Sequence, residues 1–320
     1  MSDKGMIGFY ILEILDEHSS KERKLMQSDI LAYLKKDYNI MVTRNTLSKY
    51  LKELREKGRV TGARGVYSVR EFSNNEIAIM LNSVTAVKAV PNAEIQNIVK
   101  KLRSMAEPEE RGKFCHSYYL SDLNHTDNGN VGTIINTIQR AIEDRKKLEI
   151  TACGYNVDGE LQQGKTYIVD PYYIVMEKSR AYLLCYSGRE DVEPRRIDRM
   201  ENVKIMKEKR MEICQIDRYK NRTFQIEEYM KEHIYMYSGE SARITLKIRK
   251  SKIGDFIDWF GKEYRKIQEQ EEYIIIQVKA NVEAVYFWSL QYSRIAEVIA
   301  PEKLRKKIKE GAEEIVKMYE

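Results

Sequence analysis

The chain has 320 residues, of which 42% are hydrophobic, so we expect two or three domains. The sequence contains neither an apolar run near the roughly 18 to 20 residues of a membrane span nor a signal-peptide pattern. We therefore expect a cytoplasmic protein without membrane contact. Its 4 cysteines are widely spaced without a Cys-x-x-Cys pair, which argues against disulfide frameworks and zinc ribbons. The net charge of +6 comes almost entirely from residues 1–70, with 14 basic against 9 acidic residues, and such a local excess favours a polyanion such as DNA as partner.

Residues 1–70 have the pattern of three helices followed by a β-hairpin. Apolar residues recur at helical spacing over residues 6–16 and 30–34. Thr43 is predicted to cap a third helix that runs to about Lys57 and is stopped by Gly58. Two β-type runs around a basic, glycine-rich turn follow in residues 59–69. This order is typical of a winged helix-turn-helix DNA-binding domain.

The predicted third helix separates apolar from polar side chains. Leu47, Leu51 and Leu54 share one face at spacings of four and three residues. A helix that reads DNA needs such a docking face, with amide and basic groups on the other side for bases and phosphates; an ordinary solvated face is the alternative. We expect DNA contacts from the polar side and from the hairpin, or wing: Arg44, Asn45, Ser48, Lys49, Lys52, Arg59 and Arg64.

Residues 71–130 are predicted to form a helical connector. Ser73 and Glu76 make a capping box at the start of one helix, and Pro91 separates it from a second helix. Residues 107–132 are polar and loop-rich, so we place a domain boundary near residue 130.

Residues 131–210 are predicted to form a short helix and about five strands. The helix covers residues 134–142, and the strand runs are 148–152, 167–170, 172–176, 181–186 and 203–206. Glu177 to Arg180 form a polar turn. A short helix with five bent strands suggests a small, Sm-like β-barrel.

After a linker at residues 211–240, residues 241–320 have the clearest periodicity. The order is strand, helix, two strands, helix, strand and a closing helix, which matches a ferredoxin-like fold. Trp259 and Trp288 lie in amphipathic helices and are expected in the core. The fold class is therefore multidomain α+β.

Three arginines end the predicted small sheet. Arg195, Arg196 and Arg199 hold guanidinium forks beside aromatic rings, a combination that suits phosphates and unstacked bases. Arg196 and Arg199 differ by an odd number, so a bulge or the strand end must re-aim one of them, or only one lines a pocket. Asp198 between them is interpreted as a structural carboxylate that its arginine neighbours keep ionised.

Residues 169–200 resemble a WYL domain, whose name-giving tripeptide corresponds here to Ala181-Tyr182-Leu183. Residues 141–150 resemble the lead-in helix and first strand of that family, and residues 298–305 resemble the closing signature of its C-terminal extension, WCX. The chain departs from the family pattern with alanine at 181 and 152 in place of aromatic residues, and with Arg195 in place of an apolar one. The resemblance implies a nucleic-acid or nucleotide effector bound at Tyr182, Arg196 and Arg199, and we add Arg195.

Tyr182 and Tyr186 are predicted to share one strand face, and core packing is the alternative to a role in the pocket. His116 and His125 lie near Cys115, but these are too few well-spaced ligands to predict a metal site.

Motifs for nucleotide hydrolysis, dinucleotide binding, serine hydrolysis and zinc proteolysis are absent from the sequence, so we expect no enzyme, cofactor or metal. The sequence predicts a bacterial DNA-binding transcriptional regulator, expected to be a homodimer on a double-stranded operator, whose WYL domain senses its effector. The alternative is an RNA- or single-stranded-DNA-binding accessory protein that modulates a CRISPR-type defence nuclease. An enzyme acting on nucleic acid is the third and least supported class.

Overall fold

The computed structural model describes residues 6–116, 125–189 and 191–320, except for the side chains of residues 115 and 116. The chain divides into two compact units, Met1–Gly129 and Asn130–Glu320. Each contains helices and strands, which confirms the mixed α+β class. Among the described helices, none has the combined length and apolar character that a membrane crossing requires.

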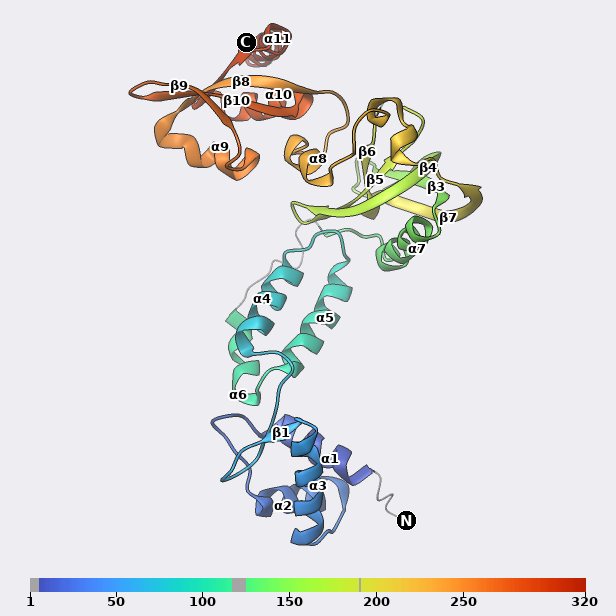
Figure 1. Cartoon of the computed structure of the whole chain (residues 1–320), viewed down its shortest axis with the longest axis vertical. Helices are drawn as coiled ribbons and strands as arrows, with labels where there is room; N and C mark the ends of the chain where they lie inside the picture. The colour runs from blue at the N-terminus through green and yellow to red at the C-terminus, as the bar shows by residue number, and fades with distance from the viewer. Residues whose placement is uncertain (1–5, 117–124, 190) are drawn as a thin grey trace. The chain divides into compact units, whose positions relative to one another are not determined.

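The first unit begins with three helices and a hairpin, as predicted (Figure 1). The helices are α1 (Ile7–His18), α2 (Gln27–Tyr38) and α3 (Arg44–Glu56), and the hairpin consists of β1 (Val60–Thr61) and β2 (Tyr67–Ser68). The hydroxyl of Thr43 accepts a hydrogen bond of 3.2 Å from the backbone N–H of Thr46, which confirms the predicted N-cap. Apolar residues of all three helices and of the hairpin form one core.

Two glycines shape the wing turn. Gly62 and Gly65 both have positive φ, and a Cβ at Gly62 would lie 2.2 Å from the carbonyl oxygen of Gly65. A β-bridge between Leu25 and Val66, which the sequence does not predict, adds a third backbone segment to the hairpin. The turn is therefore held by backbone contacts on two sides.

The rest of the first unit is helical. Helices α4 (Asn74–Thr85) and α5 (Asn92–Met105) lie side by side (Figure 1) and share an apolar core. The capping box is confirmed, because the Ser73 hydroxyl accepts from the Glu76 N–H and the Glu76 carboxylate accepts from the Ser73 N–H. The prediction of loop from residue 107 onward is wrong in part, since α6 (Pro108–Arg111) starts with proline at the first helical position, where no N–H is needed.

The second unit opens with a helix that lies against a five-stranded antiparallel sheet (Figure 1). The elements are α7 (Val131–Glu143), β3 (Lys146–Tyr155), β4 (Leu161–Glu177), β5 (Arg180–Tyr186), β6 (Glu193–Arg196) and β7 (Met200–Lys209). The strands pair in the order β6-β5-β4-β3-β7.

The two strands predicted over residues 167–170 and 172–176 are one continuous strand, β4. This strand pairs with β3 up to Val169 and with β5 from Asp170 onward. Pro171 therefore lies where the strand changes partner, beside a register irregularity, and a missing N–H is tolerated there. The proline marks the crossing from one partner to the other instead of the end of a strand.

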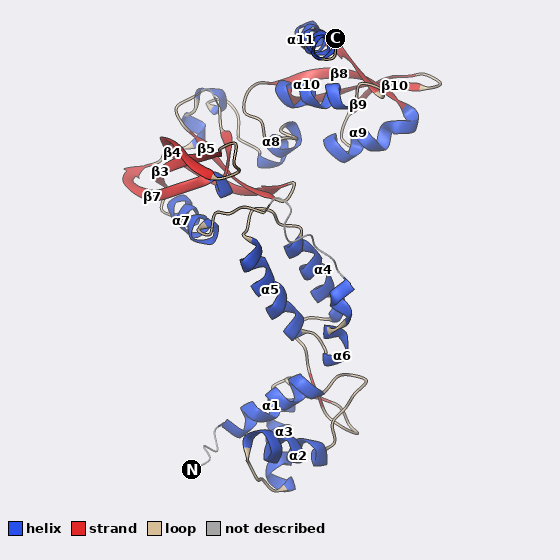
Figure 2. Ribbon diagram, turned by 180° about the vertical axis from the view of Figure 1, so that it is seen from behind, coloured by secondary structure: helices blue, strands red, loops and turns tan. Residues whose placement is uncertain are grey.

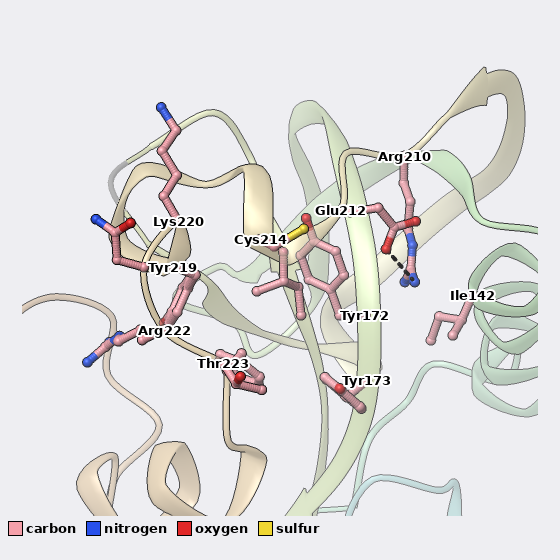
Figure 3. Close-up of a pocket in the computed structure, with 13 residues that line it drawn as sticks. Ile142, Tyr172, Tyr173, Arg210, Glu212, Cys214, Tyr219, Lys220, Arg222 and Thr223 are labelled. Atoms are coloured by element: carbon pink, nitrogen blue, oxygen red, sulfur yellow. Dashed lines mark ion pairs between the residues drawn. The ribbon is translucent and has the colours of Figure 1, made fainter.

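The segment predicted as a linker is folded and covers one face of the β4–β5 hairpin. It contains two 3-10 turns, Ile213–Gln215 and Asp217–Tyr219, and helix α8 (Ile226–Glu232). Tyr219 packs in one apolar cluster with Tyr172, and Figure 3 shows both rings in this region.

The C-terminal elements follow the predicted order. They are β8 (Ser241–Arg249), α9 (Ile253–Phe260), β9 (Arg265–Glu269), β10 (Tyr273–Asn281), α10 (Val282–Gln291), β11 (Ala296–Ala300) and α11 (Glu302–Met318). The sheet order is β11-β8-β10-β9, and α9 and α10 lie on one face of it (Figure 2). Trp288 is fully buried, as expected, whereas Trp259 is only partly buried.

Candidate nucleic-acid interface and effector site

Helix α3 presents the polar face that the sequence predicts. Leu47, Leu51 and Leu54 are buried in the core of the first unit. The five residues expected to contact DNA on this helix are all exposed: Arg44, Asn45, Ser48, Lys49 and Lys52. The division into a docking face and a polar face is therefore present in the structure, and the DNA contacts themselves stay a prediction.

The wing carries two further exposed cations, Arg59 and Arg64. Arg55, on α3, donates a hydrogen bond of 3.0 Å from Nη2 to the carbonyl oxygen of Gly62 in the wing turn. This bond ties the wing to the helix, so that the cations of both elements keep a defined relation within the first unit.

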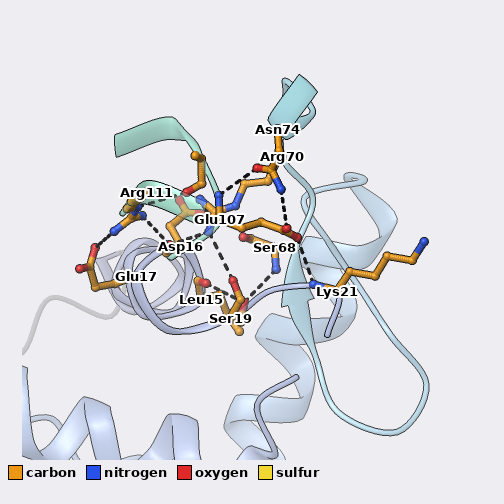
Figure 4. A network of polar contacts seen from close by, with 11 residues as sticks. Leu15, Asp16, Glu17, Ser19, Lys21, Ser68, Arg70, Asn74, Glu107 and Arg111 are labelled. Carbon is orange, nitrogen blue, oxygen red and sulfur yellow. Dashed lines mark hydrogen bonds and ion pairs between the residues drawn. The ribbon is translucent and has the colours of Figure 1, made fainter. Parts of the chain in front are cut away.

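Two other arginines in the first unit have structural contacts (Figure 4). Arg70 donates to the carbonyl oxygen of Asp16 at 2.6 Å and forms an ion pair with the Asp16 carboxylate at 3.3 Å. Arg111 donates to the same carbonyl at 3.0 Å and pairs with Glu17 at 2.9 Å. Burial lowers the pKa of Arg70, which loses hydration that exposed arginines keep. These contacts connect α1 with the end of the wing and with α6.

In the second unit, Tyr182 and Arg196 are direct cross-strand partners on β5 and β6. The guanidinium of Arg196 donates to both carboxylate oxygens of Asp198, at 3.0 and 2.5 Å. Arg180 donates to the same carboxylate at 3.3 Å. Asp198 is fully buried, and its predicted structural role is confirmed by these ion pairs.

Arg199 joins this cluster because strand β6 ends at Arg196. The chain then makes a 3-10 turn over Ile197–Arg199, so the strand end re-aims the side chain, which was one of the predicted alternatives. The Arg199 guanidinium lies over the Tyr155 ring at 5.3 Å. Its Nε is buried, and no described residue of the chain accepts a hydrogen bond from it. Arg199 is thus held mainly by a ring face.

In this cluster the guanidiniums of Arg180 and Arg196 bind the carboxylate of Asp198, and Arg199 is near enough for its charge to act on Arg180. Burial lowers the pKa of Arg180, and the charges of Arg196 and Arg199 lower it further. Burial raises the pKa of Tyr182, so its hydroxyl stays protonated near neutral pH. The sequence did not single out Arg180, which it placed in a turn; the hairpin register alone brings it to Asp198.

Arg195 does not join the cluster. It pairs with Leu183 across the sheet, on the opposite face from the pair of Tyr182 and Arg196. Its guanidinium binds the buried carboxylate of Glu193 at 2.6 Å and lies over the Tyr167 ring at 4.1 Å. The alternation of side chains along a strand separates Arg195 from Arg196, although the two are adjacent in sequence.

Among the side chains that the structure describes, no group of three or more histidine, cysteine, aspartate or glutamate residues is arranged to hold a metal ion. The side chains of Cys115 and His116 lie outside that description.

Comparison with known families decides what the five-stranded sheet is. The family model described as WYL domain matches residues 133–205. This segment is a WYL domain. None of the curated proteins matches the chain.

Two solved structures resemble the whole chain at low similarity. Proteasome accessory factor B/C (PafBC) of Arthrobacter aurescens is 13% identical with a TM-score of 0.30, and the match covers 95% of this chain and 47% of that one. This chain therefore spans about half the length of the PafBC chain. A CRISPR Cas-related protein is 13% identical with a TM-score of 0.39, covering 99% of this chain and 86% of that one. At these TM-scores the likeness does not establish a shared arrangement.

Proposed function

We propose that the chain is a DNA-binding transcriptional regulator in which the WYL domain senses an anionic effector. In this proposal, residues 1–70 are a winged helix-turn-helix, the WYL domain is an Sm-like barrel, and residues 241–320 are a ferredoxin-like WCX domain. The protein acts without catalysis, as a cytoplasmic homodimer whose paired recognition helices contact a two-fold operator.

The observation that carries the proposal is the exposed polar face of α3 beside the basic wing. Five polar or basic side chains of α3 and two arginines of the wing are exposed, while the apolar side of the helix is buried. Helix side chains in the major groove and basic groups on the flanking phosphates are what a winged domain requires. Each phosphate contact releases a counterion, which makes the binding salt-dependent.

The test is a salt titration of binding to duplex DNA recovered by cross-linking to the protein in cells. The variant Lys49→Ala/Lys52→Ala is expected to make the slope of log affinity against log salt concentration shallower by about 2, since each lost phosphate contact removes about 0.9. The control Lys306→Ala/Lys309→Ala removes two exposed charges from α11 in the second unit and is expected to leave the slope unchanged. Equal slopes in all three proteins would refute α3 as the recognition helix.

For the effector, we propose a nucleic acid or nucleotide at Tyr182, Arg180, Arg196 and Arg199. Arg180 and Arg196 share the carboxylate of Asp198, and Arg199 pairs with no described carboxylate, so the three guanidiniums keep a positive charge after these internal pairs are counted. Arg196 and Arg180 keep 22% and 18% of their side chains exposed, so a phosphate can reach them. Effector binding then favours one of two arrangements of the DNA-binding domains.

Arg199→Ala is the sharpest test of the effector site, because Arg199 forms no ion pair with a described carboxylate. Its removal therefore takes no ion-pair partner from a buried acid. We expect the variant to lose the response of operator binding to added short single strands or nucleotides while keeping operator affinity. Arg294→Ala, an exposed arginine after α10, is the matched control. An unchanged response in Arg199→Ala would remove this residue from the site.

The accessory-protein alternative predicts the opposite preference for strands. In that case short RNA or single-stranded DNA binds more tightly than duplex DNA. The loss of nucleic-acid binding is then expected in Arg199→Ala instead of Lys49→Ala/Lys52→Ala. Measuring both nucleic acids with both variants separates the two functions.

A further inference from the structure

A cavity in the second unit is separate from the arginine cluster around Asp198. Its volume is about 700 Å³, and it lies between β4 and residues 210–224 (Figure 3). The described residues that line it do not include Tyr182, Arg196 or Arg199. Small-molecule pockets have volumes of roughly 300 to 1,000 Å³, so this one has room for a compact ligand.

Aromatic rings form one wall of the cavity. Phe224 lies nearly parallel to Tyr173, with centroids 5.9 Å apart, and meets Tyr219 edge to face at 5.2 Å. The hydroxyl of Tyr172 donates to the carbonyl oxygen of Met211 at 3.0 Å, and that of Tyr219 donates to Asp191. These hydroxyls are satisfied by the protein and both rings are buried, so the apolar ring surface open to a ligand is that of Tyr173 and Phe224.

Positive charge forms the other part of the lining. Among the described residues that line the cavity, Arg210, Lys220 and Arg222 are basic and Glu212 is the one acid. Arg210 is 3.7 Å from Glu212, and Lys220 pairs with Asp217 at 2.5 Å. Arg222 is exposed and lies over the Tyr219 ring at 5.0 Å, and it forms no ion pair with a described carboxylate. Its guanidinium is thus the one best placed to take an anion from outside.

We propose that this cavity binds a small molecule that joins a flat ring to an anionic group, either a phosphate or a carboxylate. The ring packs on Phe224 and Tyr173, and Arg222 binds the anion with charge-assisted hydrogen bonds. This site is separate from the effector site proposed above, and its occupancy can be measured without DNA. Its failure would leave the DNA-binding proposal intact.

Cys214 provides a direct readout of occupancy. It is exposed and lines the cavity, whereas Cys153 and Cys185 are buried. The rate of alkylation of Cys214 by iodoacetamide is followed on the full chain by mass spectrometry of the peptide that carries it. The probes are adenosine 5′-monophosphate, indole-3-acetate, adenosine and inorganic phosphate.

We expect the probes that combine ring and anion to slow alkylation at lower concentration than adenosine or inorganic phosphate alone. Protection by the nucleotide alone identifies a phosphate ligand, and protection by indole-3-acetate alone identifies a carboxylate ligand. Arg222→Ala should weaken protection about 10- to 100-fold, as expected for a lost hydrogen bond to a charged group. In the control Arg294→Ala, the probes should protect Cys214 as well as they do in the unaltered protein.

Phe224→Leu keeps an apolar side chain but removes the ring. It should reduce protection by the ring-bearing anion to the level of inorganic phosphate. The proposal is overturned if neither ring-bearing anion protects Cys214 better than inorganic phosphate. It is also overturned if the ring-bearing anions protect Cys214 equally well in Arg222→Ala and in Arg294→Ala.

Discussion

The basic residues of α3 and the wing differ from the arginines of the WYL domain in how they are held. On α3 and the wing, the predicted DNA contacts are exposed. In the WYL domain, Arg180 and Arg196 are largely buried and share the buried carboxylate of Asp198. Exposed cations keep their hydration and attract a polyanion at long range, whereas arginines fixed by a carboxylate present a rigid group to a ligand of defined shape. In the proposed function, the exposed cations of α3 and the wing therefore attract DNA, and the arginines of the WYL domain recognise the effector.

The comparison predicts a large loss of stability when the shared carboxylate is removed. Asp198→Ala removes the carboxylate that two largely buried guanidiniums bind, so the free energy of unfolding of the second unit should fall by about 3 kcal/mol. Both tryptophans, Trp259 and Trp288, lie in the second unit, so tryptophan fluorescence in a urea titration reports this unit. Asp158→Ala, in an exposed turn, should change it by less than about 0.5 kcal/mol. Equal effects would contradict the role of Asp198.

A smaller loss is expected for Arg70→Ala in the first unit. The substitution removes hydrogen bonds to the carbonyl oxygens of Asp16 and Ser19, and leaving such groups unsatisfied costs about 1 to 2 kcal/mol. Hydrogen exchange of α1 should become faster, while tryptophan fluorescence in urea should not change. If α1 of the variant exchanges as slowly as α1 of the unaltered protein, the contacts in Figure 4 do not stabilise the unit.

The second unit should lose stability in mild acid. Burial lowers the pKa of His233, whose ring stacks on Tyr229 at 3.9 Å near Glu232, Asp191 and Arg218. Below the unfolded pKa of about 6.5, the unfolded chain therefore binds a proton that the folded chain does not. Stability from this group is complete above that pH and falls as the pH drops, with a slope of at most about 1.4 kcal/mol per pH unit.

His233→Gln should flatten this dependence between pH 7.5 and 5.5 in the same fluorescence titration. His125→Gln in the first unit should leave the dependence unchanged. A steeper dependence in His233→Gln would mean that folding raises the pKa of His233 instead of lowering it.

The smallest effect on stability is expected for Lys49→Ala/Lys52→Ala. The two side chains are exposed, and the pair of Lys52 with Glu56 spans 4.0 Å in solvent, so the change should stay within about 0.5 kcal/mol. Hydrogen exchange of α1–α3 should match that of the unaltered protein. A clear loss of protection would mean that any loss of DNA binding reflects unfolding.

Elements with strong periodicity could be predicted from the sequence. The three leucines of α3, the Thr43 cap, the Ser73 capping box and the alternating strands of residues 241–320 all gave the observed elements. Each of these signals is local, because it depends on residues within one or two turns of helix or along one strand.

Features that depend on contacts distant in sequence were missed. The cover over the β4–β5 hairpin consists of short 3-10 turns and the short helix α8, without a long apolar period, so residues 211–240 were predicted to be a linker. Strand β4 runs through Pro171 because it changes partner there, which the proline alone does not reveal. The separation of Arg195 from Arg196 followed from strand alternation and could have been predicted; the approach of Arg180 to Asp198 could not, because it depends on hairpin register.

The most direct test of the division between attraction and recognition compares three proteins on one duplex over a range of salt concentrations. Lys49→Ala/Lys52→Ala should show a slope shallower by about 2, while Arg199→Ala should keep the slope of the unaltered protein. Contradiction would come from an equal loss of slope in both variants, or from no loss in Lys49→Ala/Lys52→Ala.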